Sequence, residues 1–100
     1  MFRVLVRYRV KADKVAENEK LVQAVYKGLQ EIGDPDVHYA TFKLNDGCTF
    51  VHLASFASKD KEPVLTGSPA FKAFQAGLKD RCDQMPDNQP LTEVGSYRFV

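Results

Sequence analysis

The sequence predicts an α+β fold of the ferredoxin-like type, with its elements in the order β-α-β-β-α-β. Three observations lead to this fold class. Apolar residues alternate with period two in several short runs, a long stretch of helical period follows the first run, and Asn45-Asp46-Gly47 joins the second and third runs. We expect one domain over residues 1–100, because a chain of this length forms a single two-layer core.

The first two elements are a strand and a helix. Residues 2–10 alternate cleanly between apolar and mostly basic positions, which predicts a strand with one apolar face. From Asp13 to Ile32 the period becomes helical, and this predicts a long amphipathic helix that ends before Gly33 and Pro35. The apolar stripe of this helix consists of Val22, Val25, Tyr26, Leu29 and Ile32.

The next two elements form a hairpin. Val37–Leu44 and Cys48–Phe56 read as strands, and Asp46-Gly47 is a strong signal for the turn between them. The resulting register pairs Phe42 with Val51, Ala40 with Leu53, Thr41 with His52, and Lys43 with Phe50. We assign the first two pairs to the apolar face beneath the helices and the last two to the opposite face.

The last third of the sequence predicts a second helix and a closing strand. Pro63–Gly67 is expected to form one helical turn, and Ser68–Cys82 a helix with Ser68 as its N-cap. The buried stripe of this helix consists of Phe71, Phe74 and Leu78. Gln84–Pro90 contains two prolines and is predicted to be a loop, and Leu91–Val100 is predicted to be the closing strand.

Composition excludes several function classes. Fourteen Lys and Arg residues against thirteen Asp and Glu give a net charge of +1, so no strong field attracts a polyanion. Cys48 and Cys82 lack metal-ligand spacing, and we expect neither a metal site nor a disulfide. The N-terminal run is interrupted by Arg3, Arg7 and Arg9, which speaks against a signal peptide or membrane span and for a cytoplasmic protein.

One strand resembles a nucleic-acid-binding signature. Residues 46–53 follow the third-strand pattern of RNA-recognition motifs, in which aromatic side chains stack on bases. Asp46 replaces the basic residue of that pattern, and Cys48 replaces one of its two stacking aromatics. RNA binding is therefore kept only as a minor alternative.

The helix-free face of the predicted sheet fits a protein interface better. It would display apolar groups among polar ones, and a second copy of the sheet packed face to face would bury them. The predicted dimer-interface residues are Leu5, Tyr39, Phe50 and His52. His52 would find a structural partner there, in Thr41 or in its counterpart on the second copy.

The order and spacing of three segments resemble the antibiotic-biosynthesis-monooxygenase-like family. These segments are VRYRVKAD, TFVHLASFASKDK and, most clearly, SPAFKAF over Ser68–Phe74. The resemblance implies a dimeric α/β barrel with a small apolar pocket between each sheet and its helices. Some members of the family oxidise aromatic polyketides or quinols with molecular oxygen and no metal or flavin, others degrade haem, and several have no known activity.

The sequence departs from the family pattern at several positions. Members commonly have Trp where this chain has Phe56, and His where it has Ala70. The residues of the haem-degrading branch fall on Leu65, on Gln75 and near Val6, and all are absent. Because the chain also contains no Trp, haem degradation is not expected.

The predicted site is an apolar pocket that needs no cofactor, because cofactor-free oxygenation uses substrates that ionise to electron-rich anions. Its expected lining consists of Tyr8, Tyr26, Phe42, Phe71 and Phe74. His38 is the candidate proton acceptor, with a solvent-exposed strand-end histidine as the ordinary alternative. The functional hypothesis is a homodimer that binds a small aromatic or apolar ligand and acts as a cofactor-independent monooxygenase. The alternative is a non-catalytic ligand-binding or structural dimer.

Overall fold

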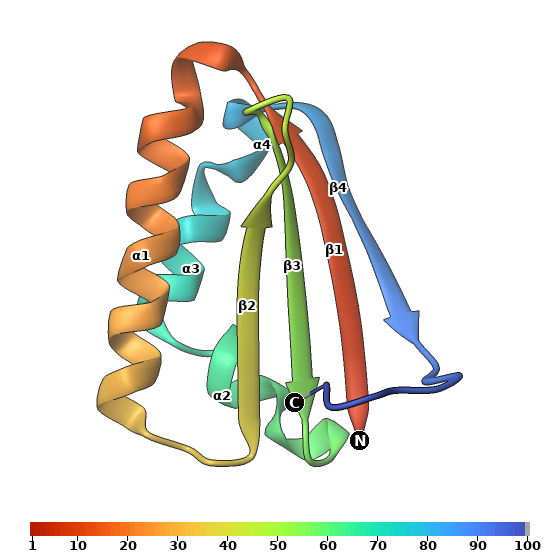
Figure 1. Ribbon diagram of the computed structural model, residues 1–100. Helices are drawn as coiled ribbons and strands as arrows, with labels where there is room; N and C mark the ends of the chain where they lie inside the picture. Colours follow the sequence, from red (N-terminus) through yellow and green to blue (C-terminus); the bar gives the residue numbers. More distant parts are fainter. Residues whose placement is uncertain (100) are drawn as a thin grey trace.

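The computed structural model describes residues 1–99 as one antiparallel sheet with its helices on a single face (Figure 1). The strands are β1 (Phe2–Val10), β2 (Val37–Lys43), β3 (Thr49–Phe56) and β4 (Cys82–Leu91). The helices are α1 (Val15–Ile32), α2 (Glu62–Thr66), α3 (Pro69–Ala76) and α4 (Leu78–Arg81), with 3₁₀ turns at Ala12–Lys14 and Lys59–Lys61. The strand order β2-β3-β1-β4 confirms the ferredoxin-like prediction.

The two main helices begin and end where local chemistry requires it. The last turn of α1 is closed by Gly33, whose φ of 65° lets its amide donate to the Leu29 carbonyl at 2.9 Å. Ser68 caps α3 as predicted, because its hydroxyl accepts a hydrogen bond from the Phe71 amide at 3.2 Å. The predicted second helix is divided at Gly77 into α3 and α4. No helix within residues 1–99 is both long and apolar enough to cross a bilayer.

The hairpin has the predicted register. Phe42 pairs with Val51 and Thr41 with His52 across β2 and β3. The turn lies one residue earlier than predicted, because the Gly47 amide donates to the Leu44 carbonyl at 3.0 Å. Asp46 holds the loop by accepting from the Thr49 hydroxyl and from the amides of Cys48 and Thr49, which lowers the pKa of its carboxyl to about 2.

The two faces of this hairpin are the reverse of those predicted. In the ladder between β1 and β3, Tyr8 pairs with Phe50, and both are buried beneath the helices with ring centres 5.6 Å apart. Because side chains alternate along a strand, His52 shares the helix side with Phe50, and Leu53 takes the open side. Both sides of β3 carry apolar residues, so the pattern of the hairpin alone left the choice of face open.

The closing strand was also predicted wrongly. It runs over Cys82–Leu91, through the segment predicted to be a loop, and residues 92–99 form no strand. β4 is an edge strand paired only with β1. Pro86 falls in the irregularity between the Arg7–Asp87 and Arg9–Gln84 pairs, where its missing amide hydrogen costs no ladder bond.

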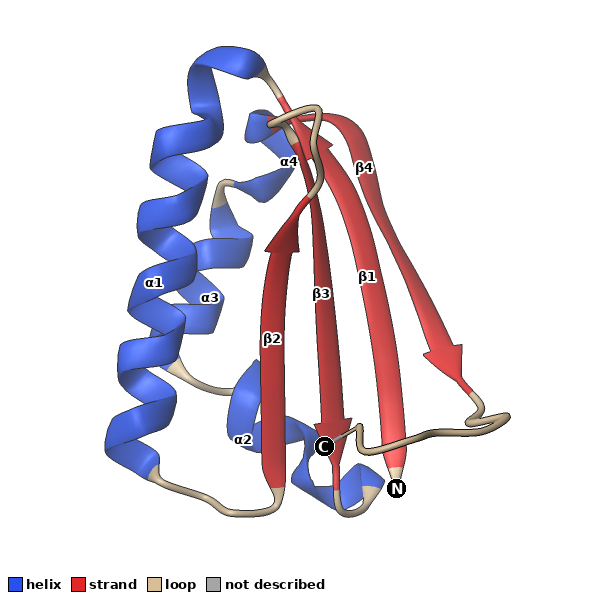
Figure 2. Cartoon of the chain, viewed as in Figure 1, coloured by secondary structure: helices blue, strands red, loops and turns tan. Residues whose placement is uncertain are grey.

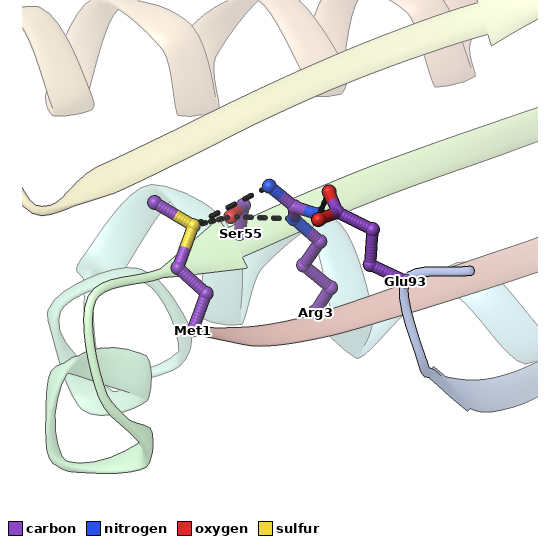
Figure 3. A network of polar contacts seen from close by, with 4 residues as sticks. All are labelled: Met1, Arg3, Ser55 and Glu93. Atoms are coloured by element: carbon purple, nitrogen blue, oxygen red, sulfur yellow. Dashed lines mark hydrogen bonds and ion pairs between the residues drawn. The ribbon is translucent and has the colours of Figure 1, made fainter. Parts of the chain in front are cut away.

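Residues 92–99 return across the helix-free face of the sheet (Figure 2). One attachment is the Arg3–Glu93 ion pair, in which Arg3 Nη1 reaches Glu93 Oε1 and Arg3 Nε donates to the Ser55 hydroxyl at 3.2 Å (Figure 3). Val94, Tyr97 and Phe99 nevertheless remain largely exposed on this returning segment.

Candidate functional site

A buried histidine lies at the centre of the layer between sheet and helices. His52 is 3% exposed and is surrounded by the rings of Tyr8, Tyr39 and Phe74, with ring centres 5.2 to 5.5 Å from its own. Its Nε2 lies 2.7 Å from the Tyr8 hydroxyl oxygen, and its Nδ1 lies 2.5 Å from that of Tyr39. Both imidazole nitrogens are therefore engaged by phenols in an aromatic setting.

The hydrogen bonds continue from Tyr8 to a buried cation. Asn18, on the sheet-facing side of α1, donates through Nδ2 to the Tyr8 oxygen at 3.0 Å. Arg81 of α4, 3% exposed, donates from Nε to Asn18 Oδ1 at 3.1 Å and from Nη2 to the Phe74 carbonyl at 2.7 Å. Gly77 makes room for it, since a Cβ there would lie 2.9 Å from Arg81 Nη1. Within residues 1–99, Arg81 forms no ion pair with a carboxylate.

The other end of the chain of hydrogen bonds reaches the edge of the sheet. The Thr41 hydroxyl lies 3.2 Å from His52 Nδ1 and 2.7 Å from the Tyr26 hydroxyl. A small cavity of about 130 Å³ opens beside these two hydroxyls, between α1 and β2. Its lining consists of Glu19, Val22, Gln23, Tyr26, Thr41, Lys43 and Phe50. We call the connected side chains, Arg81, Asn18, Tyr8, His52, Tyr39, Thr41 and Tyr26, the buried network.

Burial sets the charge states of the buried network. Desolvation lowers the pKa of His52 to about 4, so its imidazole is neutral at physiological pH. Desolvation also raises the pKa values of Tyr8, Tyr39 and Tyr26, which keeps the three phenols protonated. The guanidinium of Arg81 is then the single charge in a network of neutral groups.

A larger hollow of about 540 Å³ lies on the opposite, helix-free face. It contains His38 and Phe42, with Leu53 of β3 and Phe99 of the returning segment among its walls. Phe42 is 57% exposed there, and His38 is exposed as well. The small cavity thus lies on the helix side of the sheet and this broad hollow on its open side.

The structure divides the predicted site residues between these two places. Tyr8, Tyr26, Phe71 and Phe74 lie together beneath the helices, as predicted. Phe42 does not join them, and His38 lies with Phe42 on the other face, so the predicted pocket with His38 as its base is not assembled. The reversed faces of the hairpin are the cause of this difference.

The predicted interface residues are divided in the same way. Leu5 lies opposite Leu53 on the open face, as predicted. Tyr39, Phe50 and His52 lie beneath the helices instead, and the partner of His52 within the chain is Thr41, together with the two phenols. Because Phe50 is 2% exposed, it offers no platform for a base, and the RNA-binding alternative loses its main support.

Sequence reasoning missed Asn18 and Arg81. Asn18 precedes Val22 by four residues and so occupies a polar position within the apolar stripe of α1, a signal that was available. Arg81 gave no such signal, because it lies in a charged turn and is buried only by the path of α4 into β4. Within residues 1–99, no three His, Cys, Asp or Glu side chains group as a metal site would require.

Comparison with known proteins gives matches among solved structures. No protein-family model matches the sequence, and no curated protein matches it significantly. A provisionally named antibiotic biosynthesis monooxygenase from Bacteroides thetaiotaomicron VPI-5482 superimposes with a TM-score of 0.84 at 14% identity, covering 99% of this chain and 94% of the other. This chain has the fold of the antibiotic biosynthesis monooxygenases.

Two further structures share this monooxygenase-like fold. Rv0793 from Mycobacterium tuberculosis has a TM-score of 0.80 at 16% identity, covering 95% of this chain and 96% of its own. A variant of SnoaB, a cofactor-independent oxygenase from Streptomyces nogalater, has a TM-score of 0.75 at 14% identity, covering 98% of this chain and 97% of its own. At such identities the likeness establishes the fold, and the activity has to be argued from the site.

Proposed function

We propose that the protein is a homodimeric barrel that binds a small aromatic molecule at the α1–β2 cavity and oxygenates it without a cofactor. The observation that carries this proposal is the position of the cavity at the end of the buried network. An apolar cavity of roughly 150 Å³ holds one benzene ring. The α1–β2 cavity is smaller, at about 130 Å³, open to solvent on one side and partly polar, so it suits one polar edge of an aromatic molecule. The rest of that molecule would lie outside, beside the exposed Glu19–Lys43 ion pair.

The chemistry follows from what a cofactor-free oxygenase must do. It binds a molecule that ionises readily, keeps water from the reacting edge and favours the electron-rich anion, which reacts with molecular oxygen. In a ligand that reacts at a CH₂ group, one oxygen atom of O₂ becomes a carbonyl oxygen on that carbon. The two hydrogens of the CH₂ group leave with the other oxygen atom as water. The fold shared with SnoaB, a cofactor-independent oxygenase, supports this reaction class.

The open face of the sheet supports the homodimer of this proposal. Leu5, Ala40, Phe42 and Leu53 form an apolar surface there, and Val94, Tyr97 and Phe99 of the returning segment add to it. Apolar surface gathered on one face of so small a protein is typical of an interface. A second copy packed sheet to sheet would bury this surface and leave the α1–β2 cavity of each copy open.

Oxygen uptake with anthrone in metal-free buffer tests the proposed activity. We expect saturable uptake above the buffer rate, and a decrease of roughly tenfold or more in the Tyr26→Phe variant, because the substitution removes a hydroxyl beside the ligand. Tyr97→Phe is the matched control, since Tyr97 does not line the α1–β2 cavity and the substitution keeps its aromatic ring for the proposed interface, and it should retain the uptake. Uptake that is equal in both variants would contradict the site, and uptake at the buffer rate would contradict the activity.

One observation favours the non-catalytic alternative. Every buried polar side-chain atom in residues 1–99 has a hydrogen-bond partner, and aromatic rings fill the layer around His52. A network satisfied in this way also serves to fix a unique core. In a purely structural dimer, anthrone and related phenols would neither bind nor consume oxygen, although the protein would still sediment as a dimer.

A further inference from the structure

The direction of each hydrogen bond in the buried network can be worked out from its one charged end. Arg81 can only donate, so Asn18 Oδ1 is an acceptor and the opposite atom of the amide is the donating Nδ2. Nδ2 donates to the Tyr8 oxygen at 3.0 Å. The hydroxyl hydrogen of Tyr8 then has one acceptor within reach, His52 Nε2 at 2.7 Å.

The state of His52 follows from that of Tyr8. A neutral imidazole carries one N–H, and if Nε2 accepts from Tyr8, the hydrogen is on Nδ1. Nδ1 then donates to the oxygens of Tyr39 and Thr41, at 2.5 and 3.2 Å. The opposite tautomer would leave the hydroxyl hydrogen of Tyr8, which is 1% exposed, without an acceptor. Tyr39 is partly exposed as a residue whereas Tyr8 is fully buried, and on this difference we assign the hydrogen left without an acceptor to Tyr39.

The hydroxyls of Thr41 and Tyr26 continue the same direction of donation as far as the α1–β2 cavity. Thr41 accepts from His52, so its own hydrogen is directed to the Tyr26 oxygen at 2.7 Å. Tyr26 has no other hydrogen-bond partner within residues 1–99 and lines the α1–β2 cavity. Its O–H is therefore available to donate to a ligand, as the last donor in the series of hydrogen bonds that starts at Arg81.

We infer that Arg81 and Asn18 fix the polarity of the buried network, that is, which group donates in each of its hydrogen bonds, so that Tyr26 presents its O–H to the α1–β2 cavity. The ligand then binds to Tyr26 through an electron-rich oxygen, that of a phenolate or an enolate. This inference rests on the proposed ligand site and specifies its chemistry. His52 is then a positioning residue, because its tautomer fixes the direction in which Thr41 and Tyr26 donate. It does not act as the base. Burial keeps the pKa of His52 low, so the imidazole holds this neutral form across the physiological range.

Asn18→Asp is the decisive substitution, because it has nearly the same shape and reverses the polarity. A carboxylate has no hydrogen to donate, so it would accept from both Arg81 and Tyr8. Tyr8 would then accept from His52 Nε2–H, Nδ1 would accept from its neighbours, and Tyr26 would donate inward to Thr41. The Tyr26 oxygen would then face the cavity only as an acceptor, because its hydrogen points to Thr41. The new carboxylate would be the counterion of Arg81.

Nitrogen-15 NMR of the two histidines tests the direction without any ligand. His38→Gln assigns the signals, because the chain contains two histidines and His38 lies exposed on the other face. We expect His52 to carry its hydrogen on Nδ1 in the native protein and on Nε2 in Asn18→Asp. A hydrogen on Nε2 in the native protein, or an unchanged tautomer in the variant, would overturn the inferred polarity.

The ionisation of 4-nitrophenol tests the ligand chemistry, because its absorption reports its charge. We expect the native protein to bind the phenolate form and to lower the pKa of the bound probe, and Asn18→Asp to weaken phenolate binding at least tenfold. Preferential binding of the neutral phenol would overturn the ligand assignment. Binding of neither form would overturn both the ligand assignment and the proposed function, while the histidine tautomer decides the polarity separately.

Discussion

Replacing Leu53 by arginine should convert the protein from a dimer into a folded monomer at micromolar concentration. Leu53 lies at the centre of the open face, between Leu5 of β1 and Ala40 of β2, and it lines the broad hollow beside His38 and Phe42. A second sheet packed there would bury the new cation without a partner, which costs roughly 3 kcal/mol or more. The dissociation constant should therefore rise by about two orders of magnitude.

Sedimentation of the native protein and of two variants provides the measurement. Ile32→Arg is the control, because Ile32 is an exposed apolar residue at the end of α1, on the helix side and away from the open face of the sheet. We expect the native protein and Ile32→Arg to sediment as dimers and Leu53→Arg as a monomer with unchanged circular dichroism. A native protein that sediments as a monomer would refute the barrel.

The protein should lose stability on mild acidification, and His52 should be the main cause. Its pKa is about 4 in the folded state and about 6.5 in an unfolded chain, so the unfolded state binds the proton first. The stabilising contribution is complete above pH 6.5 and is lost as the pH falls toward 4. By linkage, the free energy of unfolding should fall by roughly 2 kcal/mol between pH 7 and pH 5.

The other groups around His52 do not explain such a loss. The phenols of Tyr8 and Tyr39 stay protonated throughout this range, because burial raises their pKa values. The hydrogen-bonded carboxyls of Asp34 and Asp46 have lowered pKa values, so their contributions are lost below the pH range of the measurement.

Urea denaturation at several pH values measures this dependence. His38→Gln should keep the slope of the native protein, because His38 is exposed on the other face. His52→Gln should be less stable at pH 7, because it loses part of the buried network, but its free energy of unfolding should change little down to pH 5. An equal slope in the native protein and His52→Gln would show that another group is responsible.

The strand order and the hairpin register could be predicted because each rests on local signals. The alternation of residues 2–10, the helical period ending at Gly33 and the turn around Asp46 are each contained in a short stretch. The N-cap at Ser68 is of the same kind, since the following Pro69 and the hydroxyl act within one helical turn. Such features depend little on the rest of the chain.

The choice of face on β2 and β3 depended on a distant element. Residues 48–56 offer Phe50, His52 and Phe56 on one side and Val51 and Leu53 on the other, and these differ little in hydrophobicity. The pairing of Tyr8 with Phe50 decides the choice, because the buried side of β1 must be continuous with that of β3. Aligning β1 with β3 before assigning faces would have given the observed arrangement.

The closing strand and the buried network could not be predicted for a related reason. Pro86 and Pro90 weigh against a strand unless it is known to be an edge strand, and the edge position comes from the complete sheet. Arg81 becomes a buried cation because α4 ends against Asn18 of the distant α1. Long-range packing of this kind gives charged residues a role that their sequence neighbours do not indicate.

A crystal structure of the protein with bound 4-nitrophenol would show the proposed sheet-to-sheet dimer and the proposed ligand site in one experiment. We expect two copies packed sheet to sheet through Leu53 and its neighbours, with the phenolate oxygen within hydrogen-bond distance of the Tyr26 hydroxyl in each α1–β2 cavity. A probe bound in the open-face hollow beside His38, or a sheet face left without a second copy, would contradict it.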